Sequence, residues 1–283
     1  MYADDTQLYV ESDIEFVENA LKQLENAIDE MKKWMKENHL KLNDAKTELM
    51  VIAKKSFLKK LQDVSINIGD TKVYSVKSIR SLGSTFDSEM SMESHINKTV
   101  GVCYGRLRQL AHIRPFITRH SAEIMVNSLI TTRLDFVNSL LYGLPSYLIE
   151  KLQRLQNNAA RLIMCKKKSD HVTPLLKELH WLPVEDRIKF KINLLTFKAV
   201  HEIAPSYLQT LIADYRPNRT LRSSFQQKLK KECGSSKKYG DRAFCVCAPQ
   251  LWNALPVELR VIHELSVFKA RLKTFYFRKN YCC

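Results

Sequence analysis

The spacing of apolar residues changes once along this chain, near Ser91, and that change constrains the fold more than any other feature. Before Ser91, short β-favouring runs surround one long helical repeat. After it, apolar residues recur every three or four positions almost to the C-terminus. Glycine is scarce, with 7 residues among 283, which disfavours barrels and sandwiches that need many tight turns. The sequence therefore predicts an α+β region followed by a mainly α-helical region.

The first region is expected to begin with a strand, a tight turn at two aspartates and a second strand, all within residues 1–10. A helix should then start at Ser12, with Glu15 completing a capping box, and stop at Asn38 in a left-handed conformation. Further on, the pattern predicts a strand at 49–52, a hairpin at 64–76 turning at Gly69-Asp70, and one short strand at 79–86.

The second region should consist almost entirely of helices, bounded by Gly, Pro and Asn residues. A segment rich in Lys, Ser and Gly, residues 226–239, is expected to be a mobile loop. The expected helices cover residues 92–112, 119–142, 146–165, 173–180, 184–202, 206–215, 241–254 and 264–279.

Charge is distributed unevenly over the chain, whose formal net charge is +15. Residues 1–50 hold 6 Lys/Arg and 12 Asp/Glu, so the remainder carries about +21. An acidic head beside a basic body suits a metal site next to a phosphate-binding surface, and the alternative is a solvated, Lys-rich surface. No apolar run reaches the ~18 residues of a membrane span. Seven cysteines without a secretion signal favour an intracellular location, in nucleus or cytoplasm.

Tyr2-Ala3-Asp4-Asp5 is the sharpest chemical motif. Two adjacent carboxylates at a turn repel each other unless a cation neutralises them. Mg²⁺ prefers one or two carboxylates together with substrate phosphates. Two such ions about 4 Å apart can stabilise both oxygens of a phosphoryl transfer. Asp4 and Asp5 are therefore candidate ligands of Mg²⁺ or Mn²⁺, although Asp-Asp at a turn is more often only a solvated turn.

The context of this motif resembles the reverse transcriptases of non-LTR (LINE-type) retrotransposons, most closely their chicken-repeat-like branch. The run Tyr2 to Tyr9 resembles the signature of that family, and the likeness spans nearly the whole chain. Later segments that carry it are Leu40-Lys41-Leu42-Asn43, Lys46-Thr47-Glu48, Ile79-Arg80-Ser81-Leu82-Gly83, Arg114-Pro115-Phe116, Gly143-Leu144-Pro145, Gln156-Asn157-Asn158-Ala159-Ala160-Arg161, Leu179-His180-Trp181-Leu182-Pro183 and Ala248-Pro249-Gln250-Leu251-Trp252-Asn253.

The resemblance implies a division into three parts. Residues 1–90 would be the C-terminal part of a polymerase palm, residues 91–165 a helical thumb-like region, and residues 166–283 a basic helical extension. Asp4 and Asp5 would be catalytic and bind Mg²⁺ or Mn²⁺, as expected of a complete polymerase. Lys46 would act near the incoming nucleotide, and its alternative role is that of a surface lysine after a turn.

The resemblance also implies an RNA template and a DNA primer as partners. Leu82 and Gly83 would shape the contact with the primer; otherwise they are a buried strand residue and a bulge glycine. The family places its fingers and the first half of its palm, with another metal-binding carboxylate, ahead of the two aspartates. Two carboxylates without a third ligand hold metals loosely, so we expect the chain alone to be inactive as a polymerase.

A second hypothesis is a non-enzymatic, basic helical protein that binds nucleic acid through phosphates. Its candidate residues are Arg106, Arg108, Arg114 and Arg119 around a helix junction, and Lys166, Lys167, Lys168, Lys228, Lys230, Lys231, Lys237 and Lys238. A third hypothesis is a zinc site made by Cys233, Cys245 and Cys247 with His263, although their spacing is not a paired C-x-x-C arrangement.

Overall fold

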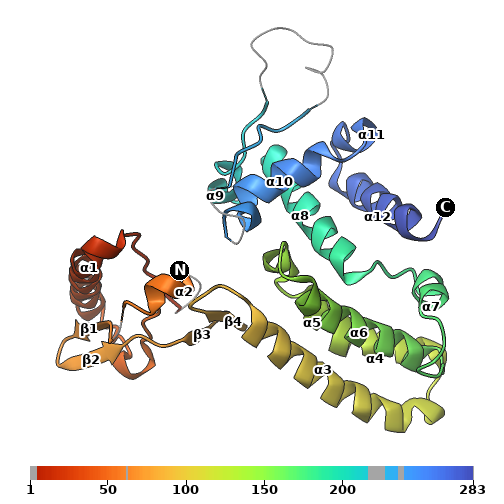
Figure 1. The fold of residues 1–283 in the computed structure, drawn as a ribbon, viewed down its shortest axis with the longest axis horizontal. Coiled ribbons are helices and arrows are strands. Elements are labelled where there is room, and N and C mark those ends of the chain that lie inside the picture. Colours follow the sequence, from red (N-terminus) through yellow and green to blue (C-terminus); the bar gives the residue numbers. More distant parts are fainter. Residues whose placement is uncertain (1–4, 62, 216–226, 235–238, 283) are drawn as a thin grey trace. The chain divides into compact units, whose positions relative to one another are not determined.

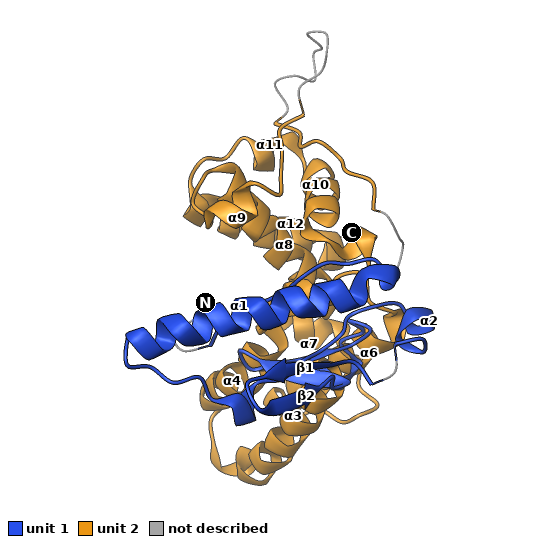
Figure 2. Ribbon diagram, turned by 90° about the vertical axis from the view of Figure 1, so that its left-hand side faces the viewer, with its two compact units in different colours: residues 1–95 blue, residues 96–283 orange. Residues whose placement is uncertain are grey.

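A computed structural model describes residues 5–61, 63–215, 227–234 and 239–282 of the chain. It confirms the α+β class, with two small antiparallel sheets among many helices. The chain divides into two compact units, residues 1–95 and residues 96–283, here called unit 1 and unit 2 (Figure 2). The predicted division at residue 165 stays a prediction. None of the described helices is long and apolar enough to cross a membrane.

Unit 1 is built on one amphipathic helix, α1 (Val17–Glu37), which follows a short 3-10 turn, η1 (Ile14–Phe16). The helix packs against a hairpin of β1 (Ser65–Ile68) and β2 (Thr71–Tyr74), which turns at Gly69 as predicted (Figure 1). The small core between them contains Ile28, Leu49, Val64, Ile66 and Ile68. The remaining short elements here are η2 (Asp44–Lys46) and α2 (Lys55–Leu58).

Several local predictions for unit 1 were wrong. Thr6–Val10 does not form the expected second strand. The capping box is absent, because the Ser12 hydroxyl donates to the Asp13 carbonyl oxygen at 2.8 Å. At the end of α1 the left-handed residue is His39 (φ 58°), whereas Asn38 has φ −97° and donates its amide to the Trp34 carbonyl oxygen. The predicted strand at 49–52 is reduced to an isolated bridge between Leu49 and Ser75.

The short strand expected at 79–86 is instead a second antiparallel hairpin, formed by β3 (Ser78–Ser81) and β4 (Ser84–Asp87). Its two turn residues both have positive φ, 45° at Leu82 and 82° at Gly83. Such a two-residue turn matches the right-handed twist of the paired strands. Sequence reasoning missed it because Leu, unlike Asn or Asp, is not a usual residue for this backbone conformation.

Unit 2 is a set of packed helices with α8 (Val184–Val200) at its centre, in contact with α5, α6, α10 and α12. The longer of its other helices are α3 (Glu93–Ile113), α4 (Arg119–Val126), α6 (Ser146–Ile163), α10 (Phe244–Asn253) and α12 (Leu265–Tyr281). Shorter helices and turns are η3 (Arg114–Phe116), η4 (Asn127–Thr131), α5 (Thr132–Asp135), η5 (Asn138–Leu141), α7 (Thr173–Glu178), α9 (Ser206–Gln209), η7 (Gly240–Arg242) and α11 (Val257–Arg260).

The largest aromatic core lies between α8, α10 and α12. The rings of Phe197 and Phe268 stack with their centroids 4.3 Å apart, and Trp252 packs beside both. A buried polar contact joins the same helices, because the Asn193 amide donates to the Tyr276 hydroxyl oxygen at 2.8 Å. Burial raises the pKa of Tyr276, so the phenol stays protonated and able to donate in turn.

The helix expected at 119–142 is interrupted. It changes from α to π geometry at η4, ends after α5, and reverses at Val137, which has φ 50°. Arg187 closes this break from α8 through an ion pair with Asp135, the last residue of α5. Periodicity alone predicted one long helix because apolar residues continue through the break at helical spacing.

The segment expected to be a mobile loop is partly held against the core. The Trp252 indole N–H donates to the Gln227 carbonyl oxygen at 2.9 Å. The Asn253 side chain both donates to and accepts from the backbone of Leu229, which is only 3% exposed. Lys237 and Lys238 lie outside the described residues. The described residues 227–234 form no helix or strand, in agreement with the predicted loop, apart from an isolated bridge between Asp214 and Leu229. The anchoring of Leu229 was not predicted, since a single buried leucine in a polar run gives little periodic signal.

Candidate nucleic-acid interface

The candidate metal site at the start of the chain is described only in part. Asp4 lies outside the described residues, and Asp5 is exposed. In the part of the chain that the structure describes, no group of three or more His, Cys, Asp and Glu side chains could hold a metal ion. Of the two candidate metal ligands, the structure therefore describes Asp5 alone.

The segment that follows Asp5 is joined to the β3–β4 hairpin. The Gln7 side-chain amide donates a hydrogen bond to the hydroxyl oxygen of Ser81, the residue before the turn. The turn itself exposes an apolar side chain, because Leu82 is 50% exposed rather than buried in a strand as in the alternative interpretation. This contact brings the neighbours of Asp5 and of Leu82 together across 74 residues of sequence, which no local pattern could predict.

Lys46 is placed at the end of η2 with an exposed side chain. The same short turn is held to α1 by an ion pair of 3.1 Å between Lys32 Nζ and Asp44 Oδ1. Within the described residues, no hydrogen bond or ion pair joins Lys46 to Asp5. Lys46 is therefore a solvent-facing cation on a fixed turn.

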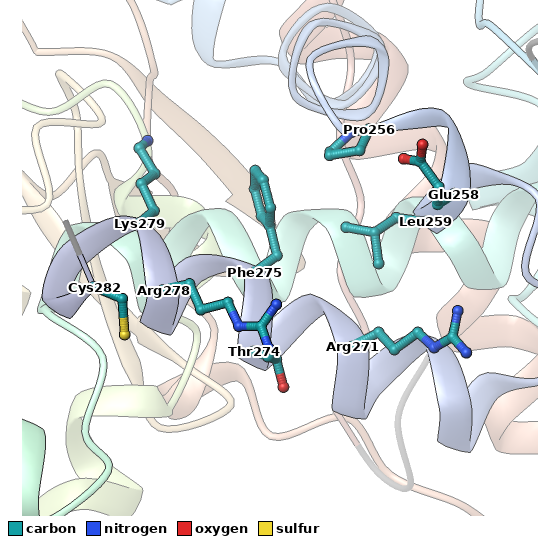
Figure 3. Close-up of a pocket in the computed structure, with 9 residues that line it drawn as sticks. All are labelled: Pro256, Glu258, Leu259, Arg271, Thr274, Phe275, Arg278, Lys279 and Cys282. Atoms are coloured by element: carbon teal, nitrogen blue, oxygen red, sulfur yellow. The ribbon is translucent and has the colours of Figure 1, made fainter.

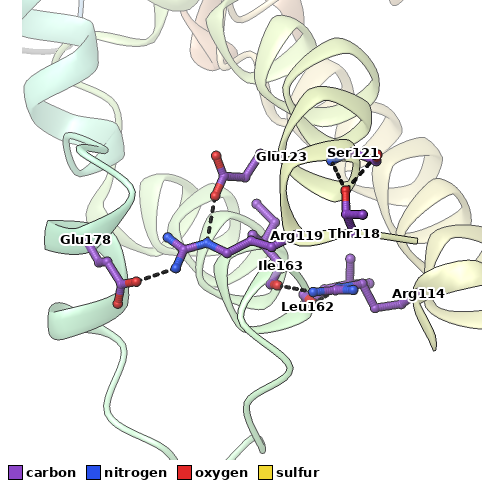
Figure 4. A network of polar contacts seen from close by, with 8 residues as sticks. All are labelled: Arg114, Thr118, Arg119, Ser121, Glu123, Leu162, Ile163 and Glu178. Carbon is purple, nitrogen blue, oxygen red and sulfur yellow. Dashed lines mark hydrogen bonds and ion pairs between the residues drawn. The ribbon is translucent and has the colours of Figure 1, made fainter. Parts of the chain in front are cut away.

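Two of the four arginines expected at the helix junction are engaged inside unit 2 (Figure 4). Arg114 donates to the carbonyl oxygens of Leu162 at 3.1 Å and Ile163 at 2.7 Å, at the C-terminal end of α6. Arg119 forms ion pairs with Glu123 and Glu178, and the hydrogen bond to Glu178 contributes most to raising the pKa of Arg119. Both side chains are already engaged within the fold, so neither is an open phosphate ligand.

Of the other candidates, Arg106, Arg108 and Lys166–Lys168 form no ion pair in the described residues. Lys230 pairs with Glu232 at 2.9 Å, and Lys237 and Lys238 lie outside the described residues. On α3, Arg108 is exposed and Arg106 half-buried, and in the described residues neither forms an ion pair. The run Lys166–Lys168 begins three residues after Ile163, the last residue of α6. Cys165, just before the run, has a left-handed conformation (φ 51°), and the Lys166 N–H donates to the Arg161 carbonyl oxygen. All three lysines are exposed. Ending the helix in this way presents three adjacent cations on a short turn.

Sequence reasoning missed one further group of cations, on α12. Between Leu265 and Tyr281 this helix carries five basic residues and no acidic one. The five are Lys269, Arg271, Lys273, Arg278 and Lys279, all exposed. Counting charges over the helix alone, rather than over runs of adjacent lysines, would have revealed them.

The residues of the zinc hypothesis do not gather into a site in the described part of the chain. Cys247 is buried in α10, and burial raises the pKa of its thiol to about 11, so it packs as a small apolar residue. Cys233 is exposed, and Cys245 is half-buried. His263 instead faces His201, with ring centroids 5.4 Å apart.

Comparison with known proteins adds no relative, because no protein family, curated protein or solved structure matches this chain.

Proposed function

We propose that this chain is part of a LINE-type RNA-directed DNA polymerase, and that its helical unit binds the nucleic acid without extending a primer by itself. The polymerase assignment rests on the residues that resemble that family, from Tyr2-Ala3-Asp4-Asp5 to the region of Trp252. In the same proposal, residues 1–90 correspond to the C-terminal part of a polymerase palm and residues 91–165 to a thumb-like region.

The observation that carries the binding function is the charge of unit 2. Residues 96–283 contain 32 Lys and Arg against 13 Asp and Glu. Four exposed members of this set, Arg108 and Lys166–Lys168, form no ion pair within the described residues, whereas the exposed Arg119 is paired with Glu123 and Glu178. Cations without an internal partner can release counterions from a phosphate backbone, which is the main source of affinity in such complexes.

We propose an RNA–DNA hybrid as the ligand, because it combines the template and primer implied by the resemblance. The exposed Leu82 supports the same placement of the primer, because the turn offers an apolar side chain beside the segment that follows Asp5. A thumb-like helical unit would grip such a duplex mainly through its phosphates.

A charge-matched pair of variants tests the binding surface. We expect Lys166→Gln, Lys167→Gln, Lys168→Gln together to weaken binding of a labelled hybrid about tenfold in fluorescence anisotropy. The control replaces Lys54, Lys55 and Lys59 of unit 1, which are also exposed, and should bind within twofold of the original chain. Equal losses in both variants would reject the lysine turn as a specific contact.

The expected absence of polymerase activity is tested separately, by primer extension. Catalysis by two metal ions requires carboxylates held in fixed positions. Asp5 is exposed and continues into a segment without regular structure, Thr6–Val10. We expect no extension of a primer on poly(rA) with Mg²⁺ or Mn²⁺. Extension that disappears in an Asp4→Ala, Asp5→Ala variant would overturn this part of the proposal and make the chain an enzyme.

A further inference from the structure

The strongest unassigned feature of unit 2 is a shallow groove along α12, closed on its other side by α11 (Figure 3). Its volume is about 620 Å³. From α12 the lining residues include Arg271, Thr274, Phe275, Arg278 and Lys279. Their spacing places them on one stripe of the helix, so the groove follows the helix axis.

The groove is positively charged along its length. Three cations, Arg271, Arg278 and Lys279, line it against one acid, Glu258 of α11. In the described residues none of these three cations forms an ion pair. Arg271 and Arg278 lie well apart along the helix in Figure 3, and seven helical residues span about 10 Å. The two guanidinium groups can therefore meet different phosphates of one strand.

An aromatic side chain stands between the two arginines in the sequence of α12. Phe275 is half-buried, so its ring is fixed by the fold yet still reaches the groove. A planar ring held among cations is the arrangement that stacks unpaired bases while the backbone is neutralised. A paired duplex does not offer its base faces in this way, so the ring favours a single strand.

The polar lining also favours a ligand that carries hydrogen-bond donors. The Thr274 hydroxyl donates to the Ala270 carbonyl oxygen at 3.1 Å, which leaves its oxygen as an acceptor. Glu258 on the opposite side is a carboxylate and accepts as well. Phosphate oxygens cannot donate to either group, whereas a ribose 2′-hydroxyl can.

From these contacts we infer that the α11–α12 groove binds single-stranded RNA, with phosphates on Arg271, Arg278 and Lys279 and a base on Phe275. The inference rests on the proposed binding of nucleic acid by unit 2. It places a separate single-stranded contact on the helix whose cations sequence reasoning missed.

The test uses the whole chain and a labelled twelve-nucleotide oligouridine. Arg271→Gln with Arg278→Gln should weaken binding at least tenfold, and Phe275→Leu at least fivefold. Lys269→Gln with Lys273→Gln removes the same charge from the same helix outside the groove and should change affinity less than threefold. All five positions except Phe275 are exposed, and circular dichroism checks that each variant is folded.

The outcomes distinguish failure of the groove, failure of the assignment to RNA, and failure of the proposed function. Equal losses for the two charge-matched doubles would overturn the groove and leave diffuse binding by unit 2. Equal affinity for an oligodeoxyuridine of the same length would overturn the role of the 2′-hydroxyl and with it the assignment to RNA. Binding of an RNA–DNA hybrid without binding of oligouridine would overturn this inference alone. Failure of the original chain to bind any of these ligands would overturn the inference and the proposed function together.

Discussion

Arg114 shows how a residue chosen for its charge can serve the fold instead. Its guanidinium also donates to the Ile117 carbonyl oxygen at 2.9 Å, so it ties the end of α3 to two carbonyl groups at the end of α6. A cation at a helix C-terminus also interacts favourably with the helix dipole. Three oriented donors in one plane are available only to arginine.

We therefore predict that Arg114→Gln lowers the free energy of unfolding by about 2 kcal/mol, since charged hydrogen bonds are worth more than neutral ones. Arg114→Lys should recover less than half of that loss. Urea unfolding of the full chain measures both. Arg108→Gln is the control, because Arg108 is exposed on the adjoining helix and should change stability by less than about 0.5 kcal/mol. A loss no larger than the control would contradict the capping role.

His201 is expected to make the stability of unit 2 depend on pH. Burial, and next the charge of His263, lower the pKa of His201 below its usual 6.5, while the backbone of Ile262 acts in the opposite direction. Near pH 6.5 the unfolded chain then binds more protons at this position than the folded chain does. The free energy of unfolding is therefore unaffected by His201 above the ordinary pKa of histidine, and it falls as the pH drops through that value.

Measuring the free energy of unfolding between about pH 5 and pH 7.5 tests this linkage. We expect the original chain to lose stability toward acid more steeply than a His201→Gln variant. A His120→Gln variant, changed at an exposed position, should follow the original chain. Identical slopes for the original chain and His201→Gln would contradict the assignment.

At the scale of elements, the β3–β4 hairpin carries both a structural cost and a proposed use. Leu82 adopts φ 45° with half of its surface exposed, which is unfavourable for an L-residue with a branched side chain. Asn-Gly is the preferred pair for such a turn. Leu82→Asn should therefore raise the free energy of unfolding of unit 1 by about 0.5 kcal/mol.

The same substitution should weaken binding of an RNA–DNA hybrid, because it removes the exposed apolar side chain. Gly83→Ala is the comparison, and should destabilise by about 1 kcal/mol at φ 82° while keeping Leu82. Stability would come from thermal unfolding and affinity from anisotropy. A Leu82→Asn variant that is more stable and binds equally well would show that Leu82 has no part in binding.

The elements also show what local patterns can reveal. The hairpin at Gly69, α1 and α6 were predictable because their apolar residues follow one period and end at clear signals. The breaks at Val137 and at Leu82 were not, since both residues adopt positive φ without being glycine. The contacts of Gln7 with Ser81 and of Arg187 with Asp135 join distant segments. Such pairs depend on the packed fold, so no local period predicts them.

In the whole molecule, the two units differ in their balance of basic and acidic residues. Residues 1–95 hold 13 Lys and Arg against 17 Asp and Glu, whereas residues 96–283 hold a large basic excess. Candidate phosphate ligands accordingly concentrate in unit 2, at Arg106, Arg108 and Lys166–Lys168. Binding carried by these cations should release about one counterion for each phosphate contact.

The salt dependence of hybrid binding tests whether unit 2 binds nucleic acid through its exposed cations. Affinity of the whole chain for a labelled RNA–DNA hybrid would be measured by anisotropy between about 50 and 300 mM salt. Phosphate contacts by Arg106, Arg108 and Lys166–Lys168 predict a slope of about −4.5 in a plot of log affinity against log salt. The slope should be smaller by about two to three units in the Lys166→Gln, Lys167→Gln, Lys168→Gln variant. A flat response, or a slope that this variant leaves unchanged, would contradict binding of the hybrid through phosphate contacts of these residues.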